Sequence, residues 1–344
     1  LASSGRGPDL LFDLSGIPEE QARELEARLE ESVATRATYL KLLAFLAAGK
    51  SQEALAVALE LSQGSANPAR DLRALIGPWL RRGQARLAAG QYEAARVELT
   101  TALRFSPDDR EVRIGLARAL RGVGSLDEAL EHAEALIEAH PTDIEAILLL
   151  ADLRVAQGDL AGSLRLLEQS EPLHPGNERL LTNLAYLLTQ LASGPDEIVQ
   201  RRLSRARELF QRASALAPRM PQPRAGLAEV YYRIGEHDLA LRQIDLALTM
   251  EESCHYRSAR GHILAARKEL PAAEAELQQA LLACPEAIDA LVMLGAVLAE
   301  QRKFVEARQS WERALAVDPQ SEAAKANLAA LEAQLALESQ RVSP

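Results

Sequence analysis

Apolar residues recur along most of the chain with the spacing of amphipathic helices, arranged as pairs of short segments separated by a turn. Over residues 79–107 an apolar stripe is interrupted at Gly90, resumes at intervals of three and four residues, and stops at Pro107. Such intervals place side chains on one face of an α-helix, and proline stops a helix because it lacks a backbone donor. Runs of β-branched residues typical of strands are absent from the sequence. The pattern therefore predicts an all-helical protein built from helix pairs.

The same pattern returns at a near-constant interval of 34 residues. Small residues form one ladder and prolines form a second, and both ladders widen to 43 residues at the same step. The ladders are Ala95, Ala129, Ser163, Ala206, Ala240, Ala273 and Ala307, and Pro107, Pro141, Pro175, Pro218, Pro285 and Pro319, with Glu252 in place of one proline. Because two separate ladders share one irregular step, we interpret the interval as a true internal repeat.

Glycines and polar residues mark the expected helix ends. Four glycines fall between the two helices of a pair, where a tight turn needs a residue that tolerates positive φ. They are Gly90, Gly124, Gly158 and Gly235. Two capping boxes are expected to open the following helices. They pair Ser125 with Glu128 and Thr142 with Glu145.

One period of this repeat resembles the consensus of the tetratricopeptide repeat family, in which the first helix carries W-x2-L-G-x2-Y and the second carries spaced alanines before a proline. One such period holds Trp79, Gly83, Tyr92, Ala95, Leu99, Ala102 and Pro107. The last holds Leu294, Gly295, Leu298, Ala307, Trp311, Ala314 and Pro319. The resemblance implies an all-α fold, a right-handed α-solenoid of antiparallel helix pairs in which small residues let the helices approach closely.

The repeat divides the chain into four expected parts. We expect a flexible tail or linker over 1–17, helices with a degenerate repeat over 18–75, seven repeats over 76–321, and a cap helix with a short tail over 322–344. The widened step inserts nine residues at about 193–203, where 193–197 predicts a loop and 198–205 predicts a lengthened second helix. A tolerated insertion and a projecting docking element both stay open.

Charge and composition narrow the classes of partner. The formal net charge is −10, which argues against nucleic acid because a binder needs a basic face for phosphates. Five of the 39 basic residues are Lys and the rest are Arg, a bias that with abundant Ala indicates a GC-rich bacterial genome. No stretch of the sequence reaches the length of a membrane span. Bacterial cytoplasm and periplasm both stay open, and because the chain begins at Leu1 an upstream segment is not excluded.

No catalytic or metal-binding motif is found, so we expect no enzyme, no cofactor and no metal site. His255 and His262 lie seven residues apart on one helix face beside Cys254, which is too far for both to bind one ion. We interpret them as groove or surface residues. Cys254 and Cys284 bracket one expected hairpin, so a disulfide is geometrically conceivable, with two free thiols as the alternative.

The resemblance implies binding of a partner peptide or helix along the concave face lined by first helices. The residues carried over to that face, with Tyr186 and Tyr232 as candidate anchors, are Arg118, Arg121, Asp152, Tyr186, Gln190, Glu229, Tyr232, Arg233 and His262. The two tyrosines can equally be consensus residues that pack between helices. The family's Lys and Asn clamp for a C-terminal carboxylate is not matched, since its first places hold Leu80 and Gln84.

The function implied is that of a protein-interaction scaffold or adaptor, within a bacterial envelope, secretion or assembly complex. The alternative is a regulatory or substrate-recruiting part of a larger enzyme or membrane-anchored protein. Self-association into a homo-oligomer also stays open, because the ends of an open repeat array can stack.

Overall fold

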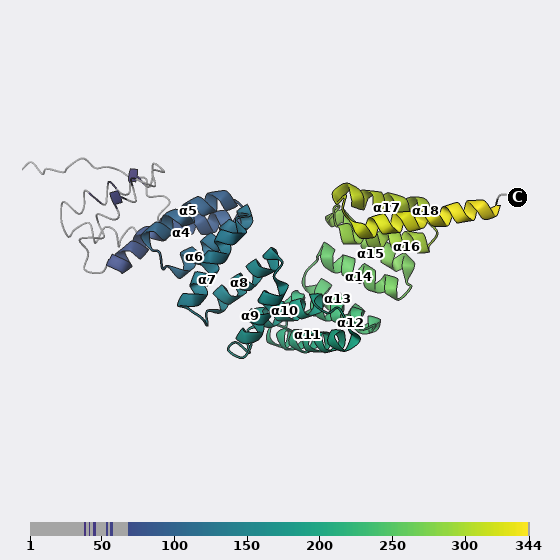
Figure 1. Ribbon diagram of the computed structural model, residues 1–344, viewed down its shortest axis with the longest axis horizontal. Helices are drawn as coiled ribbons and strands as arrows, with labels where there is room; N and C mark the ends of the chain where they lie inside the picture. Colours follow the sequence, from purple (N-terminus) through teal and green to yellow (C-terminus); the bar gives the residue numbers. More distant parts are fainter. Residues whose placement is uncertain are drawn as a thin grey trace, which may run out of the picture. The chain divides into compact units, whose positions relative to one another are not determined.

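The computed structural model describes residues 68–342 and seven isolated positions before them, and within 68–342 it contains fifteen α-helices and no strand (Figure 1). The expected tail over 1–17 and most of the expected degenerate repeat lie outside the described residues. The helices fall into two compact units, Leu1–Asp159 and Leu160–Pro344, divided between the helices labelled α8 and α9. The all-α helix-pair fold predicted from the sequence is confirmed.

The first unit contains five described helices that pack in chain order. They are α4 (Pro68–Ala88), α5 (Tyr92–Phe105), α6 (Arg110–Val123), α7 (Leu126–Ala139) and α8 (Ile144–Gln157). Helix α4 begins eight residues before the expected start of the repeats at 76. Proline is favoured in the first turn of a helix, where its missing donor costs nothing, and helix-forming residues follow it.

The second unit contains ten helices, most of them joined into hairpins by short turns. They are α9 (Leu160–Ser170), α10 (Glu178–Gln190), α11 (Asp196–Leu216), α12 (Pro221–Arg233), α13 (His237–Met250), α14 (Cys254–Ala266), α15 (Leu270–Ala283), α16 (Ile288–Glu300), α17 (Phe304–Val317) and α18 (Glu322–Val342). The pairs α10/α11, α12/α13, α14/α15 and α16/α17 pack closely, and α12, α14, α16 and α18 also contact one another in succession.

The small-residue ladder forms the contact line inside the hairpins. Its six alanines and Ser163 are all completely buried. Glycine fills the matching place on several first helices, and the last hairpin shows why. A Cβ atom added to Gly295 on α16 would lie 2.3 Å from the indole nitrogen of Trp311 on α17, well inside van der Waals contact. The predicted reason for the small residues, close helix approach, is therefore confirmed.

The turns between paired helices use left-handed backbone conformations. The four predicted glycines have φ between 70° and 90°. In the last two repeats glycine is replaced, yet Lys268 and Arg302 keep φ at 64° and 61°. The turn geometry is thus retained where its preferred residue is missing.

The two predicted capping boxes are wrong. Ser125 precedes α7 but makes no side-chain cap bond, because its backbone (φ −80°, ψ 68°) is not the extended conformation of an N-cap. At α8 the cap is Asp143 rather than Thr142, and its carboxylate accepts the backbone N–H of Glu145 at 3.0 Å. The Glu145 side chain instead pairs with Arg110 at 3.0 Å.

The inserted residues lengthen one second helix, as predicted. Helix α11 has 21 residues where α13, α15 and α17 have 14, and it starts at Asp196, two residues before the expected 198. Asp196 and Glu197 favour the earlier start because their negative charges interact favourably with the partial positive charge at the N-terminus of the helix. Arg205, within the added length, pairs with Glu171 at 2.7 Å and fastens α11 to the end of α9.

Among residues 68–342, no helix is long and apolar enough to cross a lipid bilayer.

Candidate partner-binding site

A cavity of about 660 Å³ opens on the first-helix face of the second unit. Its walls come from the second half of α12, most of α14, the first turn of α16 and the turn before α18. The lining residues are Ala228, Glu229, Tyr232, Cys254, His255, Ser258, Ala259, His262, Ile263, Ala287, Ile288, Asp289, Ala290, Asp318 and Ser321. Three successive repeats thus contribute to one recess, on the first-helix face for which the resemblance implies partner binding.

Three of the residues predicted to bind a partner meet in this cavity. Glu229 and Tyr232 come from α12 and His262 comes from α14. The ring of Tyr232 lies 5.8 Å from that of His237, centroid to centroid, which supports it from the side of α13. An aromatic ring beside carboxylate and imidazole groups can bind another side chain by stacking and by hydrogen bonds.

His262 is held mainly in its neutral form. Burial lowers the pKa of its imidazole, while the carboxylates of Asp289 and Glu229 and a hydrogen bond with the Asp289 backbone oppose that shift. A neutral imidazole offers one donor and one acceptor nitrogen. His262 can therefore make a directional hydrogen bond to a ligand without adding positive charge to the cavity.

Arg233 lies beside the cavity and is already engaged within the fold. Its guanidinium pairs with Glu229 at 2.6 Å and donates to the backbone oxygen of Thr189 at 2.9 Å. The second bond ties the end of α12 to the end of α10. Gln190, the last residue of α10, is exposed. These two predicted residues therefore lie at the edge of the first-helix face and do not line its recess.

Tyr186 takes part in the packing of the repeat. Its hydroxyl donates to the backbone oxygen of Gln222 at 2.9 Å, and its ring meets Phe210 edge to face with centroids 4.9 Å apart. Burial raises the pKa of its phenol above the ordinary range. Of the two tyrosines considered as anchors, Tyr232 therefore lines the cavity, and Tyr186 has the contacts of a packing residue.

The remaining three predicted residues lie in the first unit and are paired with one another or with neighbours. Arg121 faces Asp152 at 3.7 Å between α6 and α8. Arg118 pairs with Glu145 at 3.1 Å across the same two helices. These contacts make a charged first-helix face in this unit.

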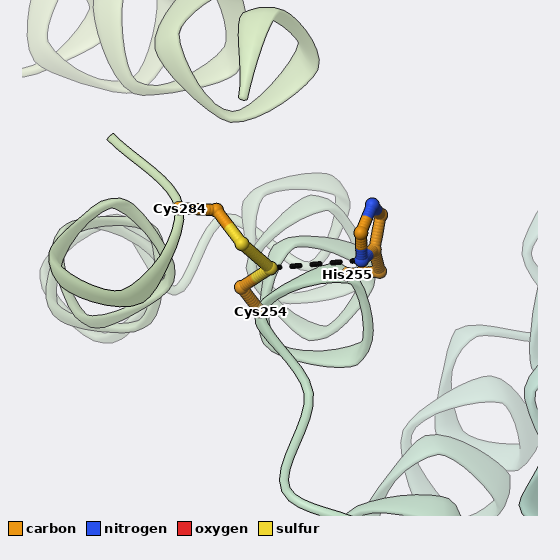
Figure 2. The surroundings of a disulfide bond; sticks show 3 residues. All are labelled: Cys254, His255 and Cys284. Carbon is orange, nitrogen blue, oxygen red and sulfur yellow. Dashed lines mark hydrogen bonds between the residues drawn. A yellow bond between two sulfur atoms is a disulfide. The ribbon is translucent and has the colours of Figure 1, made fainter. Parts of the chain in front are cut away.

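A disulfide links Cys254, which lines the cavity, to Cys284 (Figure 2). Cys254, the first residue of α14, is bonded to Cys284 at the end of α15, with Cα atoms 6.0 Å apart. The backbone N–H of Ala287 donates to the Cys284 oxygen at 3.1 Å, which connects the bond to the wall formed by residues 287–290. The ring of His255 lies on the other side of Cys254, its Nδ1 3.6 Å from Sγ.

Sequence reasoning left His255 open between groove and surface, and it did not place Asp289 and Asp318 in this site. A signal existed for the first, because His255, Ser258 and His262 lie at spacings of three and four on one helix face. Asp289 and Asp318 sit at repeat boundaries, where the sequence favours interpretation as solvated caps. Among the described residues, no group of three His, Cys, Asp or Glu side chains is arranged to hold a metal ion.

The chain carries tetratricopeptide repeats. Models of this repeat match residues 86–153, 120–185 and 191–252. Tetratricopeptide repeat protein 21B of Xenopus laevis is 30% identical over 128 residues, which are 37% of this chain and 9% of that protein. The probable biofilm formation methyltransferase WspC of Pseudomonas putida is 38% identical over 98 residues, 28% of this chain and 23% of that protein. The chain therefore spans less than a quarter of the length of either relative.

The fold also resembles solved structures of the same class. A tetratricopeptide repeat protein of Parabacteroides merdae superposes with a TM-score of 0.60 at 17% identity, covering 75% of this chain and 98% of that chain. At this identity the likeness establishes the fold, and the site must be argued from its own residues.

Proposed function

We propose that this chain is a non-catalytic scaffold that binds an extended segment of a partner protein in the cavity of its second unit. The observation that carries the proposal is the recess itself. Its volume, about 660 Å³, lies within the range of ligand pockets, and it is formed by the first helices of three successive repeats and the turn before α18.

The chemistry of the walls supports a side-chain ligand. Ala228, Ala259 and Ile263 give an apolar surface, while Tyr232 and His262 provide an aromatic face and hydrogen-bonding nitrogens. Partly buried tyrosines in recesses are enriched among residues that dominate binding energy. We propose Glu229, Tyr232 and His262 as the centre of the contact. The charged face of the first unit, Arg118, Arg121 and Asp152, is proposed as a polar contact surface of its own.

The disulfide supports an oxidising compartment for this function. Disulfides persist in secreted and periplasmic proteins and are reduced in most cytosols. Between the bacterial cytoplasm and the periplasm, Cys254–Cys284 favours the periplasm. We therefore propose that the chain functions within an envelope or secretion complex.

A second function is favoured by the methyltransferase relative. Since the match covers 23% of that protein, this array could equally recruit substrates for a larger enzyme encoded in the same chain. Sequencing the gene on both sides of the present sequence distinguishes the separate scaffold from the substrate-recruiting part of a larger enzyme. An adjoining catalytic domain would support the recruiting arm, and its absence would leave the separate scaffold.

The proposed function is tested by filling the cavity. Ser258 on α14 lines it, so Ser258→Tyr should occupy the recess without changing charge. The matched control is Gln200→Tyr, at an exposed position of α11 outside the cavity. Partners captured from the source organism by the wild-type chain should be lost with Ser258→Tyr and kept with Gln200→Tyr. Equal capture by both variants would show that the partner binds elsewhere.

A further inference from the structure

The cavity of the second unit carries negative charge that the fold leaves uncompensated. Three carboxylates line it, those of Glu229, Asp289 and Asp318, and no Lys or Arg does. Glu229 is neutralised in part by Arg233 at 2.6 Å. From the described residues, no ion pair reaches Asp289 or Asp318, and the one hydrogen bond to the Asp318 carboxylate comes from the backbone N–H of Gln320 at 2.9 Å.

The histidine between these carboxylates does not cancel their charge. His262 lies close enough to Asp289 and Glu229 to feel both, yet its burial disfavours the protonated form. Removing an ion from water costs free energy that only a partner of opposite charge returns. Asp289 and Asp318 remain at the rim in contact with water, where a cationic ligand could reach them.

Helix dipoles supply the main opposing effect. The first turns of α14 and α16 form part of the wall, and neither helix has a side-chain cap bond. The N-terminus of α18 also follows a lining residue, Ser321. A helix N-terminus is equivalent to roughly +0.5 charge, so the three together offset about one and a half carboxylates. With Arg233 offsetting about one more, an excess of roughly half a negative charge remains. The balance favours a cation over an anion.

The apolar part of the recess fits the methylene stem of a long basic side chain. Ala228, Ala259 and Ile263 form a surface on which a chain of methylene groups can lie. Lys and Arg bury such stems while their charged ends stay at the edge. Tyr232 adds a ring face that attracts a cation, Arg more often than Lys.

From this juxtaposition we infer that the cavity selects a partner segment by a basic side chain, Arg or Lys. The stem of that side chain lies on the apolar wall beside Tyr232, and its charged end pairs with Asp289 and Asp318. The inference rests on the proposed function, since it names the chemistry of the segment that the same cavity binds.

The test uses four blocked peptides, acetyl-Ala-Ala-X-Ala-Ala-amide, in which X is Arg, Lys, norleucine or Glu. Blocking removes the terminal charges, so X alone differs. Binding is followed through the imidazole carbon signals of His255 and His262 in the oxidised, full-length chain. The Arg and Lys peptides should shift these signals saturably and bind at least about fivefold more tightly than the norleucine peptide, as two exposed ion pairs allow. The Glu peptide should bind more weakly than norleucine.

Charge-removing variants separate the cavity from the overall acidity of the chain. Asp289→Asn with Asp318→Asn keeps the size of both side chains and the acceptor for Gln320, and should abolish the preference for Arg over norleucine. Asp196→Asn with Glu197→Gln removes two exposed charges on α11, outside the cavity, and should leave that preference unchanged.

Each outcome of the peptide experiment supports or overturns a named claim. A Glu peptide that binds as tightly as the Arg peptide, or an Arg preference that survives in the Asp289/Asp318 variant, overturns the charge selection while the cavity stands as a binding site. If no peptide shifts the histidine signals up to millimolar concentration, the cavity does not bind side chains, and the proposed function falls with the inference.

Discussion

At the scale of single residues, the inter-helix turns of the last two repeats hold a conformation that their residues do not favour. Lys268 and Arg302 have φ near 60° where earlier repeats use glycine. A left-handed conformation costs a non-glycine residue roughly 1–2 kcal/mol. Lys268 is held in part by Glu300 at 2.8 Å, an exposed pair of small value.

Arg302→Gly should therefore stabilise the second unit. Relief of the left-handed strain contributes more free energy than the larger loss of backbone entropy of glycine costs. We therefore expect the free energy of unfolding to rise by about 0.5–1 kcal/mol. The reverse exchange, Gly235→Ala, should cost about 1 kcal/mol or more. Urea unfolding followed by Trp311 fluorescence measures the first variant. A loss of stability in Arg302→Gly would show that the side chain contributes more than its backbone costs.

His262 should make the stability of the second unit depend on pH. Its pKa is lowered by burial in the folded chain, while the unfolded chain keeps the ordinary value near 6.5. Below that value the unfolded state binds more protons, so the free energy of unfolding falls as pH drops from about 7.5 to about 5.5. Urea midpoints of the wild type and His262→Gln, compared at both pH values, check this.

The variant should lose part of the pH dependence rather than all of it. Burial also lowers the pKa of His132 in the first unit, so that unit should respond in the same direction. Placing Trp79→Phe in both proteins leaves Trp311 to report the second unit alone. Identical slopes with and without His262 would contradict the assignment.

The site was only partly predictable at this scale. Helix periodicity is enough to place Glu229, Tyr232 and His262 on one face. It cannot show that the Tyr186 hydroxyl binds the Gln222 backbone, because a consensus tyrosine and a groove tyrosine occupy the same register. Nor can it show that Asp289 and Asp318 line one cavity, since they lie at the beginning of α16 and just after α17 and reach the same recess only when the helices pack.

At the scale of elements, each hairpin depends on one close approach between its helices. In α16/α17 this is the contact of Gly295 with Trp311, whose indole N–H donates to the Val292 backbone at 2.9 Å. Alanine is normally the better helix former by up to about 1 kcal/mol. Its Cβ would here meet a rigid ring held by a hydrogen bond.

Gly295→Ala should consequently destabilise the second unit by about 2 kcal/mol, through overpacking. Gly77→Ala in α4 is the matched control, because its Cβ would meet only the flexible end of Arg81 at 3.3 Å, and it should be neutral or stabilising. Chemical unfolding of both variants measures the difference. A stabilising Gly295→Ala would mean that the helices can separate without cost.

The disulfide should stabilise the α14/α15 hairpin. It closes a loop of 30 residues, for which chain entropy gives about 3–4 kcal/mol. Reductant should lower the melting temperature reported by Trp311 and have little effect on that reported by Trp79, because repeats interact chiefly with their neighbours. In the Cys254→Ser/Cys284→Ser variant, reductant should change nothing. A wild-type chain with two titratable thiols before reduction would contradict the bond.

The elements themselves were largely predictable. Proline, glycine and small-residue positions recur because each hairpin must stop, turn and approach its partner in the same places, so one period predicts the next. The side-chain interactions at the helix ends were less predictable. Asp143 caps α8 in place of Thr142, and Glu145 turns to Arg110, an ion pair to the preceding repeat that a local motif cannot contain.

At the scale of the whole molecule, the repeats provide many similar surfaces, and the cavity proposed to bind a partner occupies a small part of the first-helix surface of the second unit. The formal net charge of −10 makes the chain generally attractive to cations, so selectivity must come from the cavity and be separated from that background. This is why the control variants above remove charge or add bulk on α11, at positions outside the lining residues.

The most direct test of the central claim is site-specific photo-crosslinking in the source organism. A photoreactive residue replaces His255, which is exposed at the cavity rim, or Gln200 on α11 as the control. We predict a crosslink to a segment of a partner protein from position 255, none from position 200, and loss of the first when Ser258→Tyr fills the cavity. A crosslink equally strong from position 200, or one from position 255 that survives Ser258→Tyr, would contradict partner binding in the cavity.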